Sequence, residues 1–156
     1  MLAMLLMESL GTDYPNWDAG LLATDVSEKA LAVARAGVYD REGMESLPAN
    51  LRGKYFRRRS DGNFEAKPQL AAEITFRRFN LINPEFPFRA PFDIIFCCNV
   101  MIYFDGPTKE ELVRKMHRFT LPGGWFFTGH SESLERRSCP YTFVLPGAYR
   151  RGGEPG

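Results

Sequence analysis

Three polar residues follow apolar runs of the kind that form buried strands, and their side chains could bind a ligand. Asn99 and Tyr103 come after the run Phe92–Cys98, and Asp25 lies at the end of the run Leu21–Val26. In open α/β sheets, ligands bind outside the carboxyl ends of the strands. An acidic residue in such a position can hydrogen-bond the paired hydroxyls of a ribose, as in dinucleotide sites. These residues therefore indicate a ligand site at one edge of a sheet.

Simpler roles remain open for the same residues. Asn99 could cap its strand, Tyr103 could pack in the core, and Asp25 could close the turn before the next helix. The spacing of the residues does not decide between these roles and ligand binding.

The strand before Asn99 organises the expected fold. Phe92–Cys98 is a continuous apolar run broken only by Asp93, which is typical of a strand buried on both faces of a parallel sheet. Apolar periodicity, turn residues and caps predict the other elements. These are helices over Met1–Leu10, Glu28–Ala36 and Lys109–Phe119, strands over Leu21–Val26 and Trp125–Gly129, a turn at Pro122–Gly124, and a closing hairpin of Tyr141–Leu145 with Gly147–Arg151.

Composition limits the class of protein. The chain has 156 residues, of which 44% are apolar and 25% charged, as expected for one globular domain. A net charge of +1 gives no reason to expect nucleic acid as a partner. Three cysteines and two histidines do not assemble into a zinc set, so we expect no metal and a reduced, cytoplasmic protein. No apolar stretch approaches the roughly 20 residues that a membrane-spanning helix needs.

His130, Ser131 and Glu132 end the strand that begins at Trp125. Their residue types suggest nucleophilic catalysis, but three consecutive residues cannot form a triad, which needs side chains brought together from different places.

Several ordered motifs resemble the C-terminal catalytic domain of CheR-type chemotaxis methyltransferases. Those enzymes use S-adenosylmethionine to esterify glutamate side chains on chemoreceptors. The resemblance covers nearly the whole chain. The matching motifs are A-T-D-V-S-E-K-A-L (Ala23–Leu31), G-V-Y (Gly37–Tyr39), F-N-L (Phe79–Leu81), F-C-C-N-V-M-I-Y-F-D (Phe96–Asp105), L-P-G-G (Leu121–Gly124) and T-G-H-S-E-S-L (Thr128–Leu134).

This resemblance implies a role for each candidate residue. Tyr103 would be catalytic, because its ring can stabilise the sulfonium by about 0.5–2 kcal/mol or its hydroxyl can orient the incoming carboxylate. Asn80 and Leu81 would lie over the adenine. The cofactor-binding residues implied are Asp25, Asn80, Leu81, Cys98 and Asn99. No general base is needed, because a glutamate with a pKa of about 4.3 is ionised at neutral pH.

The implied fold is a class I methyltransferase-like, doubly wound α/β sheet over residues 1–151, followed by a disordered tail over 152–156. Residues 39–80 would form an inserted small antiparallel β subdomain, with strands over Phe64–Lys67 and Ile74–Phe79. The chain opens inside a helix, so we expect it to lack the first strand and its glycine-rich cofactor loop. On that basis it is expected to bind S-adenosylmethionine poorly and to turn over little.

The expected partners are the cytoplasmic helices of methyl-accepting chemoreceptors, with no nucleic acid and no membrane insertion. The inserted subdomain contains five arginines that could dock an acidic receptor surface. The same arginines could equally form a merely solvated face. The complete protein is expected to be a monomer. These arginines are Arg57, Arg58, Arg59, Arg77 and Arg78.

Two other functions compete with receptor methylation. One is a catalytically inactive remnant that only docks receptors, and the other is a methyltransferase with another substrate. Amino-methylating DNA enzymes have N-P-P-Y or D-P-P-Y after this strand, whereas the run here is N-V-M-I-Y (Asn99–Tyr103). The chain also departs from the CheR pattern at Cys98, where the family usually has arginine.

One geometric expectation follows from the resemblance. Asp25, Asn80, Asn99 and Tyr103 should line one cleft at the carboxyl ends of the strands.

Overall fold

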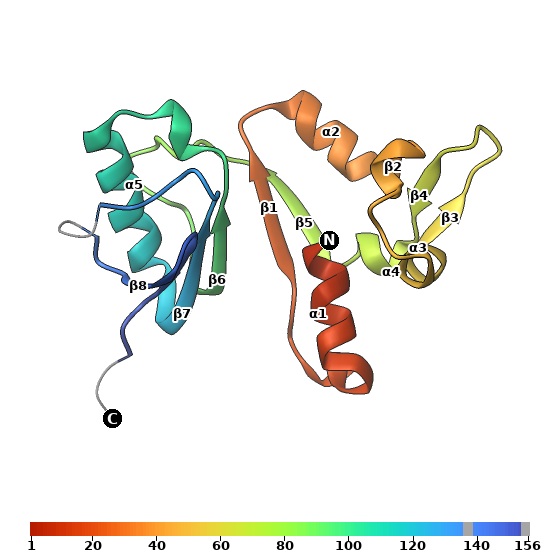
Figure 1. Ribbon diagram of the computed structural model, residues 1–156, viewed down its shortest axis with the longest axis horizontal. Helices are drawn as coiled ribbons and strands as arrows, with labels where there is room; N and C mark the ends of the chain where they lie inside the picture. The colour runs from red at the N-terminus through yellow and green to blue at the C-terminus, as the bar shows by residue number, and fades with distance from the viewer. Residues whose placement is uncertain (136–138, 154–156) are drawn as a thin grey trace. The chain divides into compact units, whose positions relative to one another are not determined.

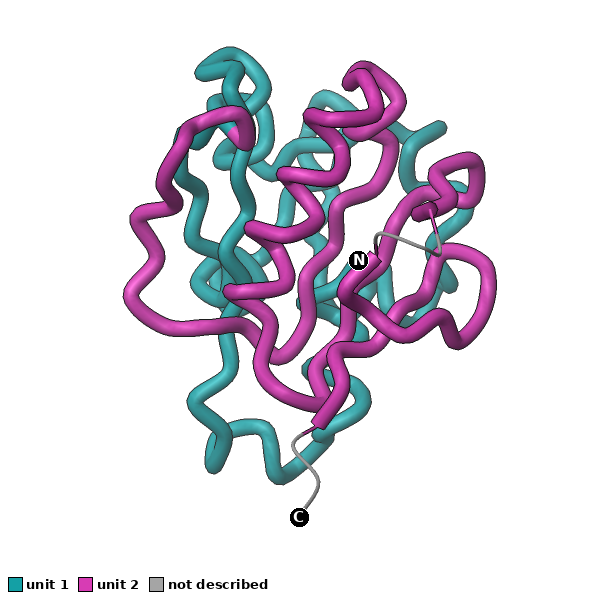
Figure 2. Tube along the Cα trace, turned by 90° about the vertical axis from the view of Figure 1, so that its left-hand side faces the viewer, with its two compact units in different colours: residues 1–80 teal, residues 81–156 magenta. Residues whose placement is uncertain are grey.

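The protein is described by a computed structural model, which covers residues 1–135 and 139–153 (Figure 1). The chain divides into two compact units, Met1–Asn80 and Leu81–Gly156 (Figure 2). A single domain over 1–151 stays a prediction. The expected tail over 152–156 lies largely outside the described residues, since 154–156 are not among them.

Unit 1 contains a pair of parallel strands joined through a helix and a small inserted sheet. Such parallel pairing requires a crossover connection. In chain order its elements are α1 (Leu2–Leu10), η1 (Gly11–Asn16), β1 (Leu21–Asp25), α2 (Glu28–Ala36), β2 (Val38–Tyr39), η2 (Glu42–Met44), α3 (Ala49–Tyr55), β3 (Phe56–Arg58), β4 (Phe64–Ala66), α4 (Pro68–Ala71) and β5 (Ile74–Arg78).

The helix after β1 has well-defined ends. The Ser27 side chain accepts a hydrogen bond from the Ala30 N–H, which satisfies one of the amides at the helix start. Gly37 ends α2 in the left-handed conformation (φ 59°), which glycine adopts without steric cost. The helix expected over Glu28–Ala36 is thus confirmed, with a cap at each end.

The inserted antiparallel sheet is confirmed, but its last expected strand belongs elsewhere. β2, β4 and β3 form a three-stranded antiparallel sheet. β5 instead pairs in parallel with β1, from Leu21 opposite Ile74 to Asp25 opposite Arg78. The segment 39–80 is therefore too long for the insertion, because β5 bonds to β1 and not to the strands of the inserted sheet.

The core of unit 1 is built from α1 and the inserted segment. The Tyr55 ring is fully buried and belongs to one cluster with Ala3 and Met4 of α1. The N-terminal helix expected over Met1–Leu10 is thus confirmed, and its apolar face packs on the segment that precedes β3. The remaining buried members of this cluster are Met44, Leu47, Phe56 and Leu70.

Unit 2 is a four-stranded mixed sheet with one long helix. The strand order is β6-β7-β9-β8, in which β6 and β7 run parallel and the other two pairs are antiparallel. Figure 1 shows α5 beside this sheet. Its elements are β6 (Phe92–Cys97), η3 (Met101–Tyr103), α5 (Gly106–Arg118), β7 (Thr120–Thr128), β8 (Thr142–Leu145) and β9 (Ala148–Arg150).

The expected burial of both faces of β6 is wrong. Cys97 and Ile95 belong to the core cluster that includes Leu112 of α5. The alternate residues Ile94 and Phe96 are 49% and 47% exposed. Side chains of a strand alternate between its two faces, so one face of β6 packs on the core of unit 2 and the other is open.

The turn expected at Pro122–Gly124 is built into strand β7. Phe92 pairs with Thr120 but Ile94 pairs with Trp125, so β7 accommodates extra residues between these two pairs. Gly123 has φ 77°, which allows the bulge. The strand expected over Trp125–Gly129 therefore begins earlier than predicted.

We predict that Ser27→Ala lowers the free energy of unfolding of unit 1 by about 0.5–2 kcal/mol, because an amide at the start of α2 loses its acceptor. Urea denaturation followed by circular dichroism measures the change. Ser60→Ala, on the exposed turn between β3 and β4, is the control and should leave stability unchanged. Equal stability of the two variants would contradict the role of the cap.

Candidate functional site

The end of β1 places Asp25 as the sequence predicted. Its Oδ1 atom accepts a hydrogen bond of 2.8 Å from the Ser27 N–H, so the carboxylate does close the turn into α2. This bond uses one of two carboxylate oxygens, and a carboxylate can accept several hydrogen bonds. Turn closure and ribose binding by Asp25 are therefore compatible.

Asn80 lies near the same strand end. The Phe79 N–H donates a 3.0 Å hydrogen bond to the Asp25 carbonyl, which continues the pairing of β1 with β5 by one residue. Asn80 follows directly and is exposed. Leu81 is the first residue of unit 2, and its half-buried side chain packs on the core cluster of that unit.

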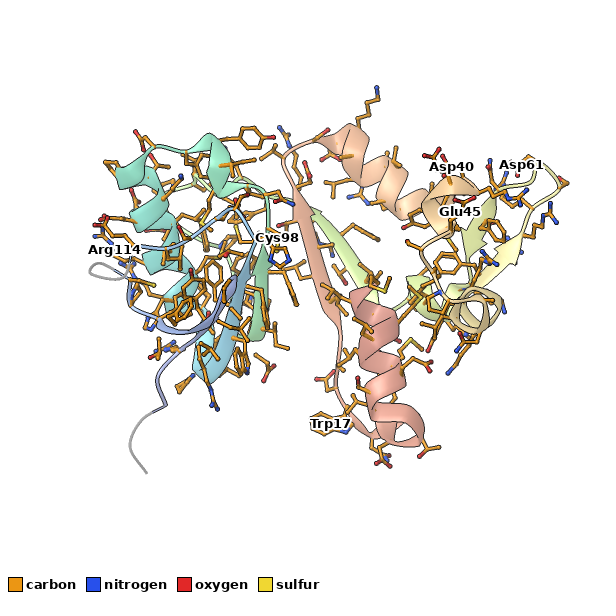
Figure 3. All side chains as sticks on the ribbon, in the orientation of Figure 1. Trp17, Asp40, Glu45, Asp61, Cys98 and Arg114 are labelled. Carbon is orange, nitrogen blue, oxygen red and sulfur yellow. The ribbon has the colours of Figure 1, made fainter. Side chains whose placement is uncertain are left out.

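The loop after β6 contains the other candidate residues. Cys98 follows the last residue of β6 (Figure 3) and is exposed, with its thiol 3.9 Å from the Phe127 carbonyl oxygen. Burial of the sulfur and the nearby Glu132 carboxylate both raise the pKa of the Cys98 thiol. The thiol is therefore neutral at neutral pH and does not replace the charge of the arginine that the CheR pattern has there.

Asn99 has an unusual backbone conformation. Its φ of 60° makes it the only residue other than glycine with positive φ among residues 1–135 and 139–153. Asparagine tolerates this left-handed region better than most residues with a side chain. The chain turns sharply at Asn99 as it leaves β6.

Tyr103 does not pack in the core. It ends the short helix η3, and its side chain is 80% exposed, whereas Met101 in the same turn is 1% exposed. Met101 belongs to the core cluster of unit 2 and anchors the turn. The structure thus rules out the alternative of a buried tyrosine and leaves its ring and hydroxyl accessible.

Glu132 is a buried residue of this loop region to which the sequence analysis assigned no function. Its carboxylate accepts hydrogen bonds from the N–H groups of Asn99 (2.7 Å), Gly129 (2.8 Å) and Ile102 (3.1 Å). His130 and Ser131 beside it are exposed. A signal was present in the sequence, because Glu132 follows the strand expected over Trp125–Gly129 as Asn99 follows the strand expected over Phe92–Cys98.

Gly129 allows the close packing around this carboxylate. A Cβ atom at Gly129 would lie 2.6 Å from the Asn99 Oδ1 atom and 2.8 Å from the Glu132 Oε2 atom. Contacts that short do not occur for real Cβ atoms, so any other residue would have to displace the Asn99 side chain or the carboxylate.

The arginines of the inserted segment are partly neutralised. Arg57 pairs with Glu65 (2.9 Å), and Arg59 pairs with Asp61 (3.2 Å) on the turn that joins β3 and β4 (Figure 3). Arg78 donates to the Val26 carbonyl. Local pairing lowers the net positive charge of the hairpin and favours a solvated face over a strongly basic docking surface.

The candidate residues fall into two groups. Asp25 and Asn80 lie together in unit 1, while Cys98, Asn99 and Tyr103 lie on one loop of unit 2. The single cleft that would join the two groups stays a prediction. Within the described ranges, no helix is long and apolar enough to cross a membrane, and no cluster of His, Cys, Asp and Glu is suited to a metal ion.

Parallel strands with polar residues at their carboxyl ends are typical of ligand-binding α/β proteins. Comparison with known proteins identifies the family within this class. Residues 1–145 match the family model "CheR methyltransferase, SAM binding domain". The chain therefore belongs to the CheR methyltransferase family.

Individual relatives agree with this family. The chain is 35% identical to the chemotaxis protein methyltransferase of Borreliella burgdorferi over 150 residues, which are 96% of this chain and 53% of the relative. It is 37% identical to that of Escherichia coli over 142 residues, covering 87% of this chain and 49% of the relative. The chain spans about half the length of these curated relatives.

A solved structure shows a weaker likeness. An S-adenosylmethionine-dependent methyltransferase from Mesorhizobium loti superposes with a TM-score of 0.43 at 23% sequence identity, covering 74% of this chain and 38% of the other.

We predict that Gly129→Ala destabilises unit 2 by about 1–3 kcal/mol, because the added methyl group has no room beside Asn99 and Glu132. Urea denaturation measures the loss. Gly106→Ala, where a Cβ atom meets nothing within 4 Å, is the matched control and should lose no stability. If both variants unfold at the same urea concentration, the packing described around Gly129 is incorrect.

Proposed function

We infer that the protein takes part in S-adenosylmethionine-dependent methylation of glutamate side chains on chemoreceptors. The observation that supports this most directly is the exposed Tyr103 beside Asn99, on the loop at the carboxyl end of a parallel strand, in a chain of the CheR family. Chemoreceptor helices as partners and a cytoplasmic location are parts of the same proposal.

The donor set suits an S-adenosylmethionine molecule. In unit 1, Asp25 would hold the ribose hydroxyls through its carboxylate, and Asn80 would hydrogen-bond the adenine through its amide. In unit 2, Asn99 would offer a further amide to the cofactor, and Leu81 and the neutral Cys98 would add apolar contact. Bound S-adenosylmethionine supplies an electrophilic methyl group on a sulfonium.

The residues of the chain would act by position and not by proton transfer. The acceptor glutamate is already ionised at neutral pH, since its ordinary pKa is about 4.3. Tyr103 would donate its hydroxyl to one carboxylate oxygen and so orient the other towards the methyl group. Its ring can also lie beside the cationic sulfur. Holding reacting atoms in line is worth several kcal/mol of barrier, roughly 7–11 in the best intramolecular cases.

The arginine-rich hairpin adds little to this proposal. Two of its arginines already pair with carboxylates of the same hairpin. We therefore assign no docking role to its charge, and the inactive docking remnant gains no support.

In a chain extended at its N-terminus by the strand and glycine-rich loop that the CheR resemblance implies, we predict that Tyr103→Phe lowers the turnover number about 10- to 100-fold with a much smaller effect on S-adenosylmethionine affinity, because it removes a hydrogen bond to a charged carboxylate. Transfer of labelled methyl groups to chemoreceptor fragments measures turnover, and calorimetry measures affinity. Tyr39→Phe, at an exposed tyrosine of unit 1, is the control. Unchanged methyl transfer by Tyr103→Phe would refute the catalytic role.

In the same extended chain, we predict that Asp25→Asn weakens S-adenosylmethionine binding by about 1–3 kcal/mol, the cost of a lost charge-assisted hydrogen bond. The asparagine oxygen can still accept from the Ser27 N–H, so the turn should remain folded. Isothermal titration calorimetry measures the affinity. Asp18→Asn, on the exposed segment before β1, should bind like the wild type. Equal affinity of both variants would remove Asp25 from the site.

A further inference from the structure

Glu132 is an acidic side chain where apolar ones are usual. It is 6% exposed and lies just after β7, in the turn that begins at Gly129. A buried carboxylate is costly unless hydrogen bonds or a cation compensate for the lost water. Among the salt bridges of the described residues, none involves Glu132, so its compensation comes from elsewhere.

Backbone amides provide that compensation. Oε2 accepts the N–H groups of Asn99 and Gly129, and Oε1 accepts the N–H of Ile102. Burial by itself would raise the pKa of Glu132, but these amide hydrogen bonds, with a further contribution from Met101, outweigh it and lower the pKa. The group is ionised at neutral pH.

The backbone of Glu132 is held by hydrogen bonds to the end of β7. The Glu132 N–H donates to the Gly129 carbonyl (2.9 Å), and the Thr128 hydroxyl donates to the Glu132 carbonyl (2.8 Å). Thr128 is the last residue of β7 and is buried. Glu132 is therefore fixed to the end of this strand.

The side-chain carboxylate of Glu132, in turn, holds the loop after β6, which contains candidate site residues. One bond restrains Asn99, whose left-handed backbone is unfavourable for most residues. The other restrains Ile102, the residue before Tyr103. Between them these bonds fix both ends of the segment from Asn99 to Ile102.

We propose that Glu132 is a positioning residue, whose ionised carboxylate locks the loop after β6 so that Asn99 and Tyr103 stand correctly for binding and methyl transfer. This inference rests on the proposed function of that loop. Glu132 acts through the loop backbone and does not itself touch the substrate.

The decisive variant is Glu132→Gln, which keeps the shape of the side chain and removes its charge. A glutamine has one acceptor oxygen, and its best placement keeps the bonds from Asn99 and Gly129 but turns an NH₂ group towards the Ile102 N–H. Glu85→Gln, at an exposed glutamate before β6, is the control.

The first measurement concerns the loop alone and needs no activity. Amide hydrogen exchange at Ile102 should accelerate about tenfold or more in Glu132→Gln, because a hydrogen bond to a charged group is lost. It should not change in Glu85→Gln. Unchanged protection of Ile102 in Glu132→Gln overturns the proposal.

The wild-type chain provides a second test of the loop, which holds even if Glu132→Gln fails to fold. The N–H signals of Asn99, Ile102 and Gly129 should titrate together in NMR spectra, with a midpoint below the ordinary glutamate value, because the pKa of Glu132 is lowered. The stabilisation that ionised Glu132 gives to the folded state is complete above the pKa that this carboxyl has in the unfolded chain. It is lost as the pH falls through the lower pKa that the carboxyl has in the folded protein. Independent titration of the three signals overturns the proposal.

The functional measurement, made on the same N-terminally extended chain as for Tyr103→Phe, separates positioning from mere folding. In Glu132→Gln, S-adenosylmethionine affinity and turnover should each fall about tenfold or more while the thermal unfolding transition of unit 2 persists. A loosened loop with wild-type affinity and turnover shows a purely structural residue and overturns the proposal. Absence of binding and transfer in both the wild type and Glu85→Gln instead removes the proposed function, and with it the positioning role.

Discussion

Parallel pairing of β6 with β7 is the constraint on which the site region of unit 2 depends. Because the two strands run in the same direction, both end at the same edge of the sheet, where Cys97 lies opposite Thr128. The loop that follows one strand and the turn that follows the other must then be neighbours. A residue after β7 can therefore hold the backbone after β6, although Glu132 and Asn99 are 33 residues apart in the chain.

The chemistry of the holding group follows from its surroundings. A lysine or arginine partner would bring a long side chain and its conformational entropy into the turn, whereas backbone amides are already fixed by the strand ends. Amides that converge on one point form an anion-binding concavity, and here the anion is a side chain of the same unit. Gly129 is part of this arrangement because only a residue without Cβ leaves room for Asn99 and the carboxylate together.

This arrangement suits the proposed reaction, which asks for accurate placement more than for acid or base catalysis. An accessible tyrosine on a loop is useful only if the loop is held. Met101 anchors the loop by packing in the apolar core, and Glu132 anchors it by accepting hydrogen bonds from its backbone. Apolar and polar contacts thus restrain one short segment, while the side chain of Tyr103 at its end stays exposed to solvent.

Features that depend on near neighbours in the chain could be predicted from the sequence. The cap at Ser27, the left-handed Gly37 and the position of Asp25 at the end of β1 involve residues within one turn of each other. Asn99 and Tyr103 could be identified as site candidates from their place after an apolar run and from the ordered family motifs, because both signals are read along the chain and need no knowledge of contacts.

Features that depend on pairing between distant segments could not be read from the sequence and became visible in the three-dimensional structure. In the structure, β5 pairs in parallel with β1, and one face of β6 is open. Tyr103 is exposed, whereas Glu132 is buried. An exposed and a buried glutamate look identical in a sequence, because the difference lies in which amides the fold brings to the carboxylate. Two of those amides, from Asn99 and Ile102, come from the loop after a strand that pairs across the sheet, and no local pattern around Glu132 encodes that pairing.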